Sequence, residues 1–168
     1  MSFTMMSKAG LRLVLGLVNL VVLGLVMTSV AEAGPQYVGR DGLAVGGYDV
    51  VSYHTGETPV EGLETITTQY NGVTWQFASE ANRDLFLADP MRYAPAYDGH
   101  CAYAAAHGNK TRTDPLAYAV VDDVLYLNFS PRIQNRWAED VPGYLERSEA
   151  NWPELVDEPA ARPSRWGG

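Results

Sequence analysis

The dipeptide Asn71-Gly72 places the strongest local constraint on the fold of this chain. It separates two runs rich in β-branched and aromatic residues, and Asn-Gly favours a two-residue hairpin turn because both turn positions take a positive φ. Pairing of Tyr70 with Val73 puts alternate residues of both runs on one face of the hairpin. We predict that this face joins the core, and its members are Ile66, Thr68, Tyr70, Val73, Trp75 and Phe77.

A second hairpin is predicted over residues 116–129, turning at Asp122-Asp123. Its expected core face consists of Leu116, Tyr118, Val120, Leu125, Leu127 and Phe129. A short strand is also predicted over residues 48–54, which alternate weakly between apolar and polar types.

Short helices are expected between and after these hairpins. Ser79 is a good cap for a helix over residues 80–88, with an apolar stripe at Ala81, Leu85 and Ala88 and with Phe86 at its edge. Further helices are predicted over residues 101–107, 131–138 and 143–150. The sequence therefore predicts a small single α+β domain, in which two antiparallel β-hairpins form a sheet packed by short helices.

The first 33 residues have the pattern of a secretory signal peptide. Lys8 and Arg12 precede an apolar run, and Ala31-Glu32-Ala33 supplies the small residues of a cleavage site. The alternative is an uncleaved membrane anchor, which would be the only expected contact with a membrane. After this segment we predict an extended lead-in at 34–46, a domain at 47–152 and a flexible tail at 153–168, and we expect a periplasmic or secreted protein.

Composition excludes several functional classes. The chain of 168 residues has 12 Lys and Arg against 20 Asp and Glu, a net charge of -8, which argues against a nonspecific nucleic-acid partner. Its single cysteine excludes an intrachain disulfide, a CxxC redox pair and a multi-cysteine zinc site. No Ser-His-Asp order, phosphate loop or dinucleotide-binding glycine pattern is present, so no enzyme class is indicated.

Several segments together resemble the YHS domain. They are 48–53, 70–79, 86–93, 100–103, 125–128 and 151–153, and they are similar to the longer exported YHS-domain proteins of bacteria over roughly residues 43–153. YHS domains attached to heavy-metal transport ATPases carry cysteines thought to bind metal, and these positions correspond to Ser52, Ala78 and Asn82 here. Since none of the three is cysteine, the resemblance does not transfer that metal site. Some exported members are thought to carry selenocysteine at the position of Cys101, which implies a reactive sulfur.

Cys101 is therefore the first candidate for a functional residue. In the first turn of a short helix, unpaired backbone N–H groups would stabilise its thiolate, and a protonated His100 would add to that effect. The alternative is a small apolar side chain packed in the core, because free cysteine is among the most buried residue types.

The candidate metal ligands are Cys101, His107 and His100, in that order, with His54 and Met91 the remaining soft or imidazole groups after residue 33. On one helix, His100 and His107 would lie ~10.5 Å apart along the axis, too far for one ion, so a shared site requires the chain to turn at one of them. A copper or zinc ion is the expected cofactor. The strand pattern of a blue-copper fold is absent.

Three functions remain open from the sequence. The first is binding of a soft or borderline metal ion, with a metal ion or a metal-handling protein as partner. The second is thiol redox chemistry at Cys101, with an external thiol resolving the product because the chain has no second cysteine. The third is a non-catalytic interaction module with Cys101 buried.

Overall fold

The computed structural model describes residues 35–55 and 58–163. The predicted signal peptide at residues 1–33 lies outside these ranges. Within them, no helix combines the length and the apolar character needed to span a lipid bilayer.

The first hairpin consists of β1 (Leu63–Tyr70) and β2 (Val73–Phe77). Tyr70 lies opposite Val73, as predicted from Asn71-Gly72, and the register shifts once between Leu63 and Thr67. The predicted core face is confirmed, since Trp75 and Phe77 are fully buried and the other members are half-buried, whereas the β1 residues of the opposite face are exposed.

Two helices follow the first hairpin, α1 (Glu80–Ala88) and α2 (Pro90–Tyr93). The predicted cap is confirmed, because the Ser79 hydroxyl accepts a hydrogen bond from the backbone N–H of Asn82 at 3.1 Å. The predicted apolar stripe is wrong. Phe86 is fully buried among aromatic rings of the hairpin, and Leu85 is 48% exposed.

The segment before the first hairpin contains two 3₁₀ turns, η1 (Val45–Gly47) and η2 (Ser52–Thr55), so the strand predicted at 48–54 is wrong. The reason is the side chain of Asp49, whose Oδ1 accepts from the backbone N–H of Val51 while its own carbonyl accepts from Ser52. These local bonds favour a turn over a strand. The predicted lead-in is also packed, since Tyr37, Ala44 and Val45 are buried.

The second hairpin consists of β3 (Asp114–Val121) and β4 (Val124–Asn128) and forms a separate two-stranded sheet. Leu125 and Leu127 join the core of the first hairpin, whereas Tyr126 joins a second cluster with Trp137. Both faces of β4 are therefore buried. The predicted single core face is only partly right, because Leu116, Val120 and Phe129 are exposed.

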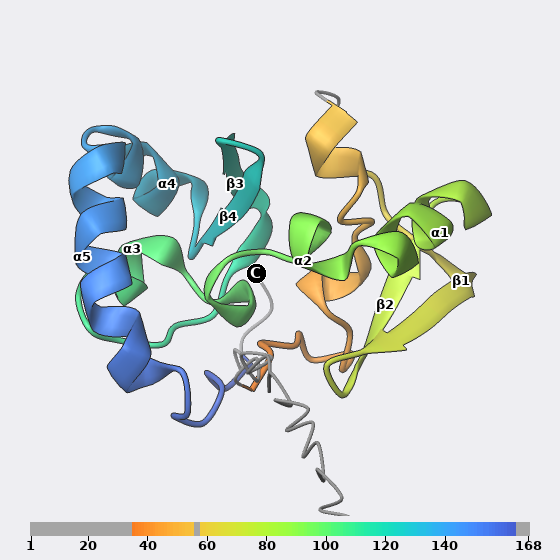
Figure 1. Cartoon of the computed structure of the whole chain (residues 1–168), viewed down its shortest axis with the longest axis horizontal. Helices are drawn as coiled ribbons and strands as arrows, with labels where there is room; N and C mark the ends of the chain where they lie inside the picture. The colour runs from red at the N-terminus through yellow and green to blue at the C-terminus, as the bar shows by residue number, and fades with distance from the viewer. Residues whose placement is uncertain (1–34, 56–57, 164–168) are drawn as a thin grey trace, which may run out of the picture. The chain divides into compact units, whose positions relative to one another are not determined.

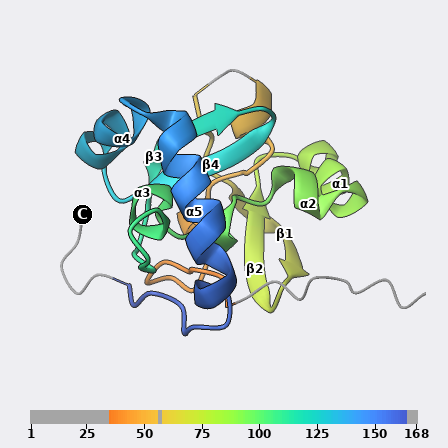
Figure 2. The same cartoon turned by 60° about the vertical axis from the view of Figure 1, so that its left-hand side comes forward.

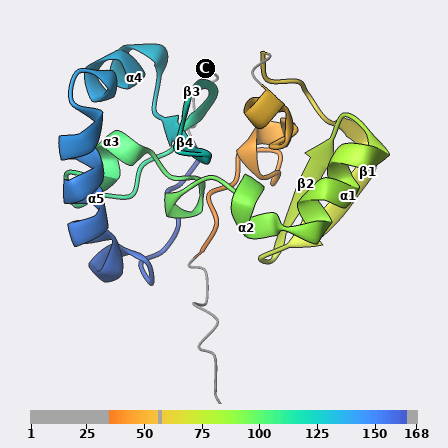
Figure 3. The ribbon, with the colours of Figure 1, turned by 45° about the horizontal axis from the view of Figure 1, so that its top comes forward.

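Four helical segments complete the fold: η3 (Tyr97–Gly99), α3 (Ala102–Ala105), α4 (Pro131–Ala138) and α5 (Val141–Leu155). Figures 1 and 3 place α3 and α4 beside the second hairpin, with α5 packed on the outer side of α3 and with α1 beside the first hairpin. The class of fold is confirmed as α+β with two antiparallel hairpins.

The last helix begins earlier and ends later than the predicted range 143–150. Asp140 caps α5, so Pro142-Gly143 falls in its first turn, and the helix continues through Pro153 to Leu155, passing alongside α3 (Figure 2). Beyond it, the carbonyls of Val156 and Glu158 accept hydrogen bonds from Lys110 at 3.0 and 2.7 Å. The helix is held by Tyr144, Leu145 and Trp152 packing on the second cluster.

Candidate functional site

Cys101 is the N-cap residue of α3, one position before the predicted first turn, and the helix ends at Ala105, earlier than the predicted residue 107. Cys101 is 1% exposed. Its Sγ lies 3.7 Å from Oδ1 of Asn128, a fully buried residue at the end of β4. The same oxygen accepts from the backbone N–H of Tyr103 at 3.2 Å. Since a carboxamide oxygen can only accept, the contact with Cys101 is a bond donated by the protonated thiol.

Two opposing influences act on the pKa of Cys101. Burial raises the pKa of the thiol above its ordinary value, and this influence is the larger. Backbone N–H groups of Ala104, Phe129 and Tyr103 act in the opposite direction by favouring the thiolate. The net direction therefore opposes the thiolate-favouring context expected from the sequence.

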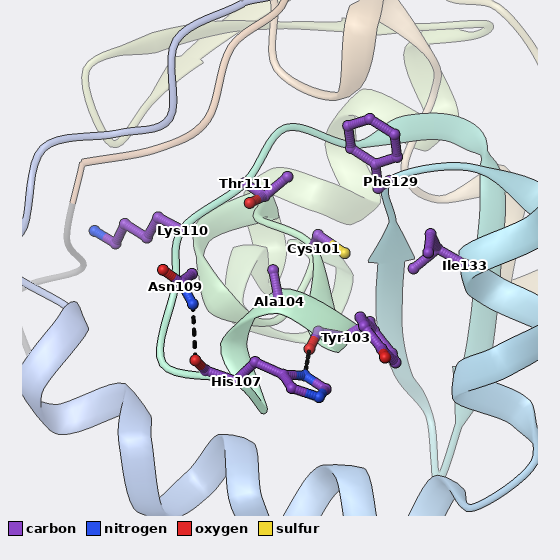
Figure 4. A pocket seen from close by; sticks show the side chains of 9 residues that line it. All are labelled: Cys101, Tyr103, Ala104, His107, Asn109, Lys110, Thr111, Phe129 and Ile133. Carbon is purple, nitrogen blue, oxygen red and sulfur yellow. Dashed lines mark hydrogen bonds between the residues drawn. The ribbon is translucent and has the colours of Figure 1, made fainter.

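A pocket with a volume of about 350 Å³ reaches Cys101. Its floor is formed by α3, and its walls come from the segment after α3 and from the junction of β4 with α4 (Figure 4). The lining residues are Cys101, Tyr103, Ala104, His107, Asn109, Lys110, Thr111, Phe129 and Ile133. Cys101 is thus buried from bulk solvent but borders a space that a small ligand can occupy.

His107 lines the same pocket and is exposed. Its Nδ1 lies 2.7 Å from the carbonyl oxygen of Tyr103, so Nδ1 carries the proton and Nε2 carries the free lone pair. The imidazole also stacks on the Tyr103 ring, with centroids 4.4 Å apart. In Figure 4 the sulfur of Cys101 points toward Phe129 and Ile133, whereas the His107 ring lies at the opposite side beside Tyr103.

His100 is fully buried and uses both ring nitrogens. Nδ1 donates to the carbonyl of Tyr97 at 2.9 Å, and Nε2 accepts from the backbone N–H of Ala161 at 3.1 Å. Burial lowers its pKa to about 4, with Lys110 acting in the same direction and the bond to Tyr97 opposing it. A neutral His100 with no free lone pair neither assists the Cys101 thiolate nor serves as a ligand in this conformation.

The other candidate ligands lie elsewhere. His54 contacts Asp123 at 3.4 Å and the Tyr93 ring, and Met91 is 80% exposed on α2. Among residues 35–55 and 58–163, no group of three or more His, Cys, Asp and Glu side chains is placed to hold a metal ion. A four-coordinate zinc site with three or four protein ligands is therefore not built in this part of the chain.

The three positions that correspond to cysteines in metal-binding YHS domains gather around Asp49. The Asp49 Oδ2 accepts from the backbone N–H of Ala78 at 2.9 Å and from Nδ2 of Asn82 at 2.7 Å, and Ser52 bonds to its carbonyl. Asp49 itself is fully buried. A hydrogen-bonded carboxylate thus occupies this place in the fold.

Sequence reasoning missed Asn128 and the polar wall formed by Asn109, Lys110 and Thr111. Asn128 ends a strand and Asn109 follows Gly108, so both had the appearance of ordinary loop or turn residues. Only the packing of β4 against α3 brings Asn128 to Cys101, and no local sequence signal reports that contact.

Residues 51–97 match the family model of the YHS domain. The match confirms the resemblance over η2, the first hairpin, α1 and α2, and it ends before Cys101 and the pocket. No curated protein and no solved structure matches the chain.

Proposed function

Because residues 51–97 match the YHS domain, a family generally linked to metal handling, we propose that this protein binds a soft metal ion, Cu(I), at Cys101. The observation that carries the proposal is that the one thiol of the chain borders a pocket shared with an imidazole, that of His107. Thiolate is the side chain that selects Cu(I) most strongly, and imidazole also suits copper.

The donor set favours Cu(I) over Zn(II). Zinc takes four ligands, and a site built by protein groups would need a cluster that the described residues do not form. Cu(I) is satisfied by two ligands, a thiolate and an imidazole. His107 is the candidate for the second role because its imidazole is exposed and lines the same pocket.

Backbone N–H groups near Cys101 favour the ionised sulfur, which is the form that binds a metal ion. A bound soft cation replaces the thiol proton, and the amides of Ala104, Phe129 and Tyr103 then donate to the sulfur in its ionised form. Because burial raises the pKa of Cys101, proton release accompanies binding, and affinity rises as the pH rises. His107 must turn from Tyr103 toward the sulfur, a rotation that an exposed side chain makes readily.

Copper retention under anaerobic, reducing conditions tests the proposal. Wild-type protein should keep one equivalent of Cu(I) in competition with a colorimetric chelator, Cys101→Ser should keep none, and His107→Gln should bind more weakly. His54→Gln is the matched control, because it removes a histidine outside the pocket and should retain copper. Full retention by Cys101→Ser would refute the proposal.

The protein would bind its metal ion outside the cytoplasm. The pattern of residues 1–33 supports export to the periplasm or beyond, with the mature chain starting at Gly34. A metal ion or a metal-handling protein of that compartment is the proposed partner.

One observation favours a second function, a non-catalytic interaction module. Cys101 is 1% exposed, as a packed structural thiol would be. Alkylation distinguishes the two. A module of this kind should label at Cys101 only after unfolding, whereas a thiol that receives a metal through the pocket should label in the folded protein as the pH rises.

A further inference from the structure

The pocket at Cys101 is larger than a metal ion requires. Its volume of about 350 Å³ lies in the lower part of the range found for small-molecule sites. One wall is apolar, formed by Phe129 and Ile133, and the facing wall carries the polar side chains of Asn109, Lys110 and Thr111 (Figure 4). Such a space fits a small organic molecule with an apolar part and a polar part.

The charge around the pocket points to an anion. Acidic residues outnumber basic ones 20 to 12 in the chain, yet no acidic side chain lines this pocket. Lys110 lines it, and the Arg112 guanidinium lies 4.4 Å from the centroid of the Phe129 ring. Arg136 hydrogen bonds to Tyr103. Three basic residues therefore either line the pocket or contact residues that do.

Carboxylates act against this field at Lys110 and at Arg136. The Lys110 ammonium donates to carbonyls of the C-terminal segment and interacts with Asp98, Glu158 and Asp157, and Glu139 interacts with Arg136. Arg112 and Arg136 contact the pocket through different walls, Phe129 and Tyr103. The positive potential therefore does not depend on Lys110 alone.

We infer that this pocket binds a small anionic thiol compound, and that Cys101 exchanges with the disulfide form of that compound. The Cys101 thiol loses its proton to solvent, its sulfur attacks one sulfur of the disulfide, the S–S bond breaks and a small thiolate leaves. The product is a mixed disulfide on Cys101. Because the chain has no other cysteine, a second small thiol must reverse the step, which returns Cys101 to the thiol and releases the small disulfide.

Three small disulfides of similar size test the inference: dithiodipropionate is anionic, cystamine is cationic and hydroxyethyl disulfide is neutral. Metal-free protein is incubated with each at pH about 8.5, and mixed disulfide formation is followed by intact mass. Each rate is divided by the rate of a free uncharged thiol with the same reagent. The anionic disulfide should react roughly tenfold faster than the cationic one, and added salt should shrink the ratio.

Charge variants locate the source of the preference. Arg112→Gln should reduce the ratio several-fold, and Arg136→Gln provides a second variant, in which the replaced side chain is exposed and the change should not disturb folding. The control is Arg83→Gln, which removes the same charge from α1, where Arg83 pairs with Asp84 and Glu80. It should leave the ratio unchanged.

Two results would overturn the inference: equal or faster reaction with cystamine, and no reaction of folded protein with any of the three reagents under conditions that modify the unfolded chain. Neither result concerns copper. Cu(I) retention with no preference for the anionic reagent would leave the proposed function standing and remove this inference. A clear preference for the anionic reagent without Cu(I) retention would remove the proposed function and leave this inference standing.

Discussion

Acid should destabilise this protein through one buried imidazole, His100. Its two hydrogen bonds require a neutral ring, because Nε2 accepts from the N–H of Ala161 and cannot do so when protonated. We therefore propose lowering the pH and comparing the wild type with His100→Gln, which has no titrating group and keeps an amide oxygen and an amide N–H at this position.

The size of the effect follows from the pKa of His100, which burial lowers from 6.5 to about 4. Below pH 6.5 the unfolded chain takes up a proton that the folded protein does not bind, so the free energy of unfolding falls as the pH falls. The full stabilisation is present above that value. At a pH of about 4.5 the loss amounts to about 2.5 kcal/mol, and it levels off below the folded pKa.

Urea unfolding followed by tryptophan fluorescence measures this difference, since the chain has four tryptophans. Carboxylates also titrate in acid, so the useful quantity is the pH-dependent loss in the wild type minus the loss in His100→Gln. We expect about 2.5 kcal/mol between pH about 7 and about 4.5. Parallel pH profiles for the two proteins, or an NMR titration of His100 with a midpoint near 6.5, would refute the reasoning.

Four further outcomes are expected. Asp49→Ala should lower the free energy of unfolding by about 3 kcal/mol in urea titrations, because it leaves three buried or half-buried hydrogen-bond donors without an acceptor. A loss below about 1 kcal/mol would contradict this account. Phe86→Ala should cost about 3 to 5 kcal/mol and Leu85→Ala less than about 1 kcal/mol by the same measurement, the reverse of what the predicted stripe implies. Ser79→Ala should cost about 1 kcal/mol, with Ser79→Asp near neutral, and equal losses in both would argue against a capping role. Export in a bacterial host should yield a mature protein starting at Gly34 by N-terminal sequencing, and retention of residues 1–33 would favour the anchor.

The features that sequence predicted well are encoded locally. Asn71-Gly72 determines the turn and register of the first hairpin, and Ser79 and Ser130 cap α1 and α4 through their own hydroxyls. Each of these depends on residues within a few positions of one another. The helix start next to Cys101 belongs to the same class.

The errors arise where distant contacts decide the outcome. The turn at η2 and the orientation of α1 both follow from Asp49, whose carboxylate bonds to Ala78 and Asn82. That bond turns Asn82 and Phe86 inward, so Leu85 faces solvent. No periodicity within residues 80–88 contains this information.

The candidate site shows the same division. The sequence predicted Cys101 and His107 as candidate ligands, and both line one pocket in the structure. The sequence could not show that the His100 ring bonds to the backbone of Tyr97 and Ala161. That orientation depends on Tyr97, which adopts φ of 56°, and on Ala161, which is distant in the chain. The polar wall of the pocket was missed because its residues acquire a shared role only through packing.

The position of β4 has a consequence for cooperativity. Leu125 and Leu127 pack on one cluster and Tyr126 packs on the other, so a single strand of five residues belongs to both. Neither cluster can unfold without exposing apolar surface of this shared strand. We therefore expect both clusters to unfold in one cooperative transition. Amide protons of β4 should consequently be the slowest to exchange with deuterated water.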